Sequence, residues 1–108
     1  MAVNSDLMRG VAEPVVLKLL AERTMYGYEI IRHVNERTNG AFAWKEGTLY
    51  PCLHRLEEQG LIESSWQLAG SKPRKYYAIT RKGEAAMSEK VKEAKEFSRA
   101  LNLLLGAI

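Results

Sequence analysis

Apolar residues in the first part of the chain recur at helical spacing. In residues 6–21 they cover more than one stripe, which indicates a helix buried on more than one side. Pro14 is tolerated far better in the first turn of a helix than in its interior, so we expect the regular helix to begin there. A second helix is predicted at about residues 27–38, with Asn39-Gly40 as its stop signal. Its core-facing positions are Ile30, Ile31 and Val34.

The next apolar positions predict a very short strand and a third helix. Residues 41–45 alternate, with Phe42 and Trp44 on one side, which is typical of a strand. The helix is predicted to start around residues 46–48 and to end before Gly60, because Pro51 requires that the first turn lie just ahead of it. Its buried face is formed by Leu49, Leu53 and Leu56, with Cys52 close to it.

After this helix the pattern changes to an alternating one. Residues 62–69 and 74–80 predict two strands, with Trp66, Tyr76, Tyr77 and Ile79 as strand formers. Residues 70–73 between them have turn chemistry, so the two strands should form a hairpin. Tyr76 and Tyr77 are neighbours in the second strand, and we expect one to be buried while the other faces outward.

A long helix is predicted after the hairpin. Thr80 is a candidate N-cap, and Glu84 lies in the first turn. Apolar residues then follow at steps of three and four over about three heptads. Packing of the whole seam on its own domain is disfavoured. About 22 residues at 1.5 Å each span roughly 33 Å, whereas a domain of this size has a radius of gyration of about 13 Å. The seam consists of Met87, Val91, Ala94, Phe97 or Ser98, Leu101, Leu104 or Leu105, and Ile108.

Composition fits one globular domain, and the distribution of charge indicates the kind of partner. The chain has 108 residues, of which 46% are hydrophobic and 27% charged, with a net charge of +3. Five cations and no acid lie in residues 70–83, so the rest of the chain carries more acids than cations. This local surplus predicts one surface made for a polyanion. The five cations are Lys72, Arg74, Lys75, Arg81 and Lys82.

Several classes of protein are disfavoured by the sequence. A single cysteine, Cys52, cannot form a disulfide within a monomer, and neither a signal peptide nor a membrane span is recognisable. His33, His54 and Cys52 lack the spacing of a metal site, and no paired nucleophile and base is recognisable. We therefore expect a cytoplasmic protein that is not an enzyme, needs no cofactor or metal, and does not contact a membrane.

The order of helix, helix, tight connection, helix and hairpin is that of a winged helix-turn-helix. The expected fold class is mainly α with a small β-hairpin. We assign residues 1–80 to a winged helix-turn-helix DNA-binding domain and residues 81–108 to a C-terminal dimerisation helix, together forming one continuous compact unit. If the leucines of the third helix face inward, its other side is polar or cationic and could read bases in the major groove.

The last helix indicates a partner, because an apolar stripe of this length would otherwise stay uncovered. A second copy is the simplest partner, and a two-fold dimer would place two recognition helices on the half-sites of a pseudo-palindromic operator. The residues assigned to this interface are Leu7, Met8, Val11, Met87, Val91, Ala94, Phe97, Leu101, Leu104, Leu105 and Ile108.

Several linked motifs resemble the PadR family of bacterial transcription regulators. They are YGYEI at 26–30, EGTLYP at 46–51, LHRLE at 53–57, GLI at 60–62 and RKYY at 74–77, followed by IT at 79–80 and KG at 82–83. The likeness covers about residues 8–83, and the motifs are specific in combination although none is so alone. The single short C-terminal helix resembles the small subfamily, in which one helix per subunit forms the dimer interface.

The resemblance implies a homodimeric, sequence-specific DNA-binding repressor that releases DNA when a small-molecule effector binds. A small aromatic effector between the subunits would fit this scheme, although the seam has Phe97 and no tryptophan, unlike the multidrug-binding members. By motif, Tyr26 and Tyr28 open the helix that crosses the DNA backbone. The assigned DNA-binding residues are Tyr26, Tyr28, Lys45, Thr48, Tyr50, Pro51, His54, Arg55, Lys72, Arg74 and Lys75.

Other interpretations stay open from the sequence. The wing cations could form a solvated turn, and Tyr50 could be a core or boundary aromatic instead of a DNA contact. The rival function from another class is a winged-helix protein–protein interaction module that does not bind DNA. A small-molecule sensor with its ligand between the paired last helices is compatible with DNA binding.

Overall fold

The N-terminal apolar segment folds as two helices. The structure is a computed structural model that describes residues 3–106. Helix α1 spans Ser5–Arg9 and α2 spans Ala12–Glu22, with a two-residue break between them. Pro14 lies in the first turn of α2, as expected, because a first-turn residue has no helical partner for its N–H.

The helix-turn-helix follows with the predicted boundaries. Helix α3 spans Gly27–Arg37, and α4 spans Glu46–Glu58 with Pro51 inside it. The predicted stop signal after α3 is confirmed, since Asn39 and Gly40 both have positive φ, at 52° and 80°. These backbone conformations end the helix and turn the chain toward α4.

The prediction of a strand at residues 41–45 is wrong. The Asn35 side chain holds the Trp44 backbone on both sides, accepting from its N–H at 2.7 Å and donating to its carbonyl at 3.0 Å. Ala43 has a φ of 49°, which a strand excludes. The rings of Phe42 and Trp44 stack on each other, with centroids 6.5 Å apart. The alternation of apolar and other residues in this segment therefore reflects side-chain packing and not a pleated strand.

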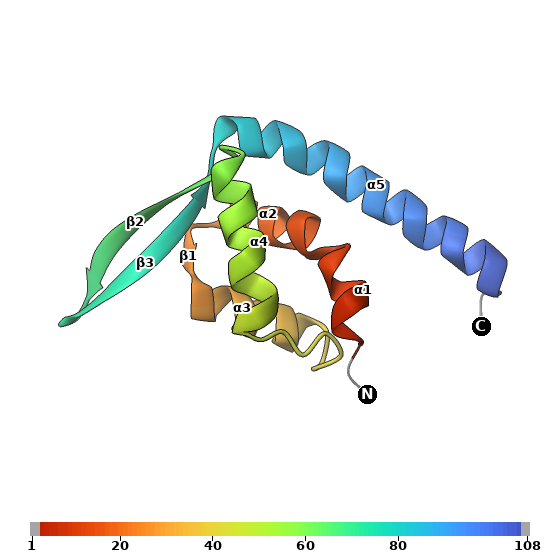
Figure 1. Cartoon of the computed structure of the whole chain (residues 1–108), viewed down its shortest axis with the longest axis horizontal. Helices are drawn as coiled ribbons and strands as arrows, with labels where there is room; N and C mark the ends of the chain where they lie inside the picture. Colours follow the sequence, from red (N-terminus) through yellow and green to blue (C-terminus); the bar gives the residue numbers. More distant parts are fainter. Residues whose placement is uncertain (1–2, 107–108) are drawn as a thin grey trace.

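The sheet has three antiparallel strands in the order β1-β3-β2. Strand β1, Met25–Tyr26, was not foreseen; it pairs only with the inner end of β3. Strands β2 (Ile62–Ala69) and β3 (Lys72–Ile79) form the predicted hairpin. Its turn has only two residues, Gly70 and Ser71, so two of the residues predicted to turn belong to β3. The hairpin projects far from the helices (Figure 1).

The core lies between α2, α3, α4 and the base of the hairpin. Trp44 is buried, and its indole N–H lies 3.3 Å from the Met8 sulfur. Tyr77 is buried and Tyr76 is half-buried, so the expected alternation in β3 is confirmed. The largest fully buried side chains are Trp44, Leu17, Met25, Ile30, Leu49, Leu53, Leu56 and Ile62.

Helix α5, Arg81–Leu105, is anchored at its N-terminus. Thr80 caps it as predicted, accepting from the Gly83 N–H at 3.0 Å, and donates its own hydroxyl proton to the Gly60 carbonyl at 2.7 Å. Gly83 packs directly on the Leu61 carbonyl, where no Cβ would fit. The first half of α5 packs on α2, and the second half extends past the helical body (Figure 1).

Candidate nucleic-acid interface

The cations of the wing are positioned by aromatic rings. The Arg74 guanidinium lies 4.4 Å from the centre of the Tyr26 ring, and Tyr26 packs edge-on against Tyr76 at 5.5 Å. The Lys75 ammonium lies 5.8 Å from the centre of the Tyr77 ring. Burial raises the pKa of the Tyr77 phenol, with Tyr50 and Glu57 adding to the shift. These contacts fix two cations beside the start of α3.

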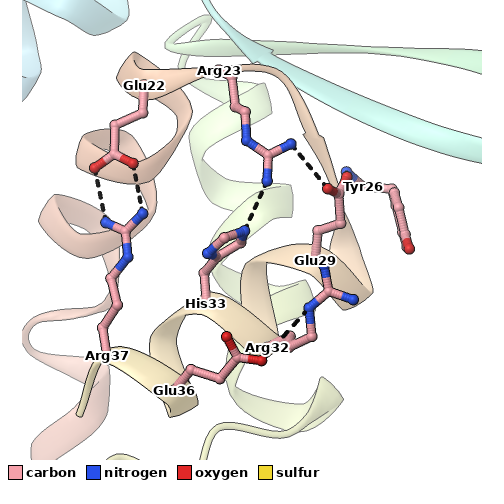
Figure 2. A network of polar contacts seen from close by, with 8 residues as sticks. All are labelled: Glu22, Arg23, Tyr26, Glu29, Arg32, His33, Glu36 and Arg37. Atoms are coloured by element: carbon pink, nitrogen blue, oxygen red, sulfur yellow. Dashed lines mark hydrogen bonds and ion pairs between the residues drawn. The ribbon is translucent and has the colours of Figure 1, made fainter.

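A polar network holds Tyr26 in place (Figure 2). Its backbone N–H donates to one oxygen of the buried Glu29 carboxylate at 3.2 Å. The other oxygen accepts from Arg23 at 3.1 Å, and the same guanidinium lies 2.8 Å from Nε2 of His33. The network satisfies a free N–H at the start of α3 and so fixes the junction from which Tyr26 projects.

A second bridge in Figure 2 joins the end of α2 to the end of α3. Arg37 donates two hydrogen bonds to Glu22, at 2.7 and 2.8 Å. These bonds lower the pKa of Glu22 and raise the pKa of Arg37. The Arg23–Glu29 and Glu22–Arg37 pairs hold the two ends of α3 against the end of α2. The first turn of α3 then lies beside the wing.

Helix α4, the predicted recognition helix, presents a mixed outer side. Tyr50, Pro51, His54 and Arg55 are exposed, and Thr48 is half-buried. Tyr50 is a boundary residue, because its side chain is 44% exposed while its hydroxyl packs against Gly27.

A hollow of about 620 Å³ lies between the β1–α3 junction, α4 and the outer half of the hairpin. We call it the wing hollow. It brings together six of the eleven assigned DNA-binding residues, and it also contains Trp66, which sequence reasoning treated only as a strand former. Its lining is Tyr26, Gly27, Tyr28, Tyr50, Trp66, Lys72, Pro73, Arg74, Lys75 and Tyr77.

The other assigned residues lie along α4, outside the wing hollow. Lys45 is exposed at the N-cap. His54 pairs with Glu58 one turn on, at 3.2 Å. Arg55 contacts Glu13 of α2 at 3.4 Å, and the same carboxylate accepts from Lys90 of α5 at 3.0 Å. Arg55 is therefore already engaged within the chain.

The fold and this arrangement can be compared with known proteins. Residues 16–89 match the model of the "Transcriptional regulator PadR-like family". The chain belongs to the PadR family. Its expected fold class, mainly helical with a small antiparallel sheet in a winged-helix arrangement, is confirmed by the PadR structures that it resembles.

Individual known proteins align with nearly the whole chain. A transcriptional regulator from Clostridium thermocellum is 35% identical, with a TM-score of 0.82 over 90% of this chain and 95% of that one. A PadR family regulator from Eggerthella lenta is 34% identical, with a TM-score of 0.77 over 95% and 88%. An uncharacterized protein from Lysinibacillus sphaericus is 40% identical over 104 residues, 95% of either chain. PadR proteins are transcriptional regulators and not enzymes, as expected.

The PadR chain also exposes much of the seam assigned to dimerisation. Phe97, Leu101, Leu104 and Leu105 are exposed on α5, and Leu7 is exposed on α1. Met87, Val91, Ala94 and Val11 are half-buried. Met8 differs, because it belongs to the core of the single chain, and Ile108 lies outside the described residues.

The described residues contain neither a membrane-spanning helix nor a cluster of metal ligands. Within residues 3–106, no helix is both long and apolar enough to cross a membrane, and no three metal-ligating side chains gather at one point. Cys52 is buried in the core, and burial raises the pKa of its thiol to about 12. The thiol therefore stays protonated and serves as packing.

Proposed function

We propose that this PadR-family regulator binds double-stranded DNA as a homodimer and represses transcription at a pseudo-palindromic operator. The observation that carries the proposal is the wing hollow, where cations and aromatic side chains from separate elements meet beside the recognition helix. Arginine and lysine bind phosphates, and a helix of this kind fits the major groove. Such a regulator would act in the cytoplasm, where a bacterial chromosome lies.

The roles divide by position. Lys72, Arg74 and Lys75 bind phosphates from the wing, and Tyr28 adds a hydroxyl from the start of α3. Base contacts come from the outer side of α4, at Thr48, Pro51 and His54, with Tyr50 at the edge of the hollow. Lys45 approaches the backbone at the N-terminus of α4. Arg55 reaches DNA only after it leaves Glu13, so it contributes less than its charge alone suggests.

The test is a salt titration with a triple variant, in which Lys72, Arg74 and Lys75 are replaced by alanine. Binding to all duplexes should weaken, and the slope of log K against log salt should become less negative by up to about 5 for six phosphate contacts per dimer. The matched control removes three cations from the exposed side of α5, at Lys92, Lys95 and Arg99, and should keep the slope.

Two results would refute the proposal. An unchanged slope in the wing variant would remove the wing from the interface. Failure of the unmodified protein to bind any duplex at low salt would leave the rival function, a protein–protein interaction module. A duplex selection with the unmodified protein would then show whether the preferred sites have two-fold symmetry, as a dimer requires.

The homodimer is supported by the exposed apolar residues of α5 and α1. A protein of 12.2 kDa that covers this seam with a second copy should scatter light as a particle of twice that mass. Replacing Phe97 and Leu101 with aspartate should halve the mass, whereas the same change at Glu93 and Glu96 should not. A particle of single-chain mass at micromolar concentration would refute the dimer.

Relief of repression by a small effector is supported by an open groove of about 400 Å³ between α2, α3 and α5, which also includes the seam residues Val11, Val91 and Ala94. This volume falls within the range of ligand pockets. Val15, Leu19, Val34 and Phe42 are among its lining residues, and Phe42 stacks with Trp44. A ligand there should change the Trp44 emission and weaken operator binding. An effector bound solely between two α5 helices would weaken operator binding without that change.

A further inference from the structure

The outer half of the wing carries an apolar strip that the helical body does not cover. Trp66 is 68% exposed and Leu68 is 75% exposed, and the two lie on the same face of β2. Pro73, the β3 residue opposite Leu68, is also exposed. We call Trp66, Leu68 and Pro73 the wing strip. Nearer the base, the same face of β2 carries the buried Ile62, so the strip continues the core-facing side beyond the core.

Single exposed apolar residues are ordinary, but this strip is continuous and lies on an edge strand. Strand β2 is the outer strand of the sheet, so an apolar face there invites aggregation unless something covers it. Trp66 also lines the wing hollow, beside cations and tyrosines that the proposed function places on DNA. The strip is therefore continuous with that interface.

We propose that the wing strip makes apolar contact with duplex DNA, and the proposal rests on the DNA binding argued above. The indole of Trp66 packs against the deoxyribose rings of the backbone strand that lies in the wing hollow. Leu68 and Pro73, nearer the tip, reach the wall of the adjacent minor groove. The wing thus binds DNA through shape and apolar contact area as well as through charge. Trp66 is then a specificity-determining residue, because the width of the groove depends on the DNA sequence.

Charge favours DNA over a protein as the occupant. Trp66 lies directly opposite Lys75 in the hairpin register, so these two side chains share one face of the sheet. Lys72 and Arg74 lie on the other face of β3, on either side of Pro73, and line the same wing hollow as Trp66. The core of a protein interface is depleted in lysine, whereas a sugar–phosphate backbone offers anionic and apolar surfaces side by side.

The first experiment tests whether removing the apolar side chains of the wing strip weakens DNA binding without changing its salt dependence. The double change Trp66→Ser and Leu68→Ser should weaken duplex binding by on the order of tenfold per wing, with the slope of log K against log salt unchanged. The matched control is Leu103→Ser, an exposed leucine of α5 outside the wing, and this variant should bind as the unmodified protein does. Trp66→Phe should restore part of the loss, because it keeps an aromatic face.

The second experiment uses Trp66 as its own reporter. Trp44 is only 2% exposed, so external quenchers reach mainly Trp66. Duplex DNA should shift the emission to shorter wavelength and protect it from acrylamide, and the Trp66→Phe variant should lose both effects. Emission of the unmodified protein that is unchanged by saturating duplex would overturn the proposal.

The outcomes separate this proposal from the one on which it rests. If the unmodified protein binds duplex with a steep salt slope while the serine variant binds equally well, the wing strip is not in the interface but DNA binding stands. If no duplex binds, both fail. If the serine variant changes the particle mass in solution, the strip is a contact between protein chains, and the proposal is wrong.

Discussion

Removing the Glu29 carboxylate should be far more damaging than removing its neighbour on the same helix. The Glu29 side chain is 12% exposed, accepts the Tyr26 N–H at 3.2 Å and pairs with Arg23 at 3.1 Å. A hydrogen bond to a charged acceptor contributes about 1.5–3 kcal/mol, and an ion pair with a half-exposed arginine about 0–1 kcal/mol. Glu29→Ala should therefore lower the free energy of unfolding by about 2–3 kcal/mol.

The matched control is Glu36→Ala, also on α3. The Glu36 side chain is 66% exposed, and its carboxylate pairs with Arg32 at 3.8 Å on the surface, so its loss should cost less than about 0.5 kcal/mol. Urea unfolding at one fixed protein concentration measures both, because the stability of the proposed dimer would depend on concentration. Equal midpoints for the two variants would show that the network of Figure 2 does not stabilise the start of α3.

Three further predictions concern other parts of the chain. Gly83→Ala should cost at least about 1–3 kcal/mol in urea unfolding, because a Cβ has no room there, whereas Gly47→Ala, with open space around it, should gain about 0.5–1 kcal/mol. Cys52 should resist Ellman's reagent at pH 8 in the folded protein and react once urea unfolds it, since burial raises its pKa to about 12; rapid labelling without urea would contradict this. The pKa of Glu22 is lowered in the folded protein, so its ionised carboxylate stabilises the fold at any pH above the ordinary carboxylate pKa. This contribution is lost as the pH falls and the carboxylate becomes protonated. Glu22→Gln should therefore reduce the stability difference between pH 7 and pH 3, by less than about 1 kcal/mol because Arg37 and Glu22 are both exposed, and an unchanged difference would argue against the bridge.

The fold was predictable where local chemistry decides it. Pro14, Asn39-Gly40 and Thr80 mark helix ends through backbone geometry that is the same in any protein, and all three act as expected. Strand β1 was not predictable, because two residues have no period and pair only when β3 arrives from 50 residues further along the chain. The false strand at residues 41–45 arose because stacked rings imitate alternation.

The candidate site could likewise be predicted from the sequence only in part. The wing cations could be found as a charge surplus, and the tyrosines through a family motif. Trp66 was missed because its exposure depends on how far the hairpin extends beyond the body, although its position two residues before Leu68 was a signal. The engagement of Arg55 by Glu13 joins residues 42 positions apart, and no local pattern reveals it.

The anchoring of α5 determines where its far end lies. Its 25 residues extend about 37 Å from a joint formed by Thr80, Gly83 and the Leu61 carbonyl. The first half of the helix packs on α2, and Lys90 pairs with Glu13, so its angle is fixed well beyond the joint. A change of about 5° in that angle would move the far end by roughly 3 Å, which is most of the rise per base pair of a duplex. The packing of α5 on α2 therefore determines how precisely the distant leucines are placed.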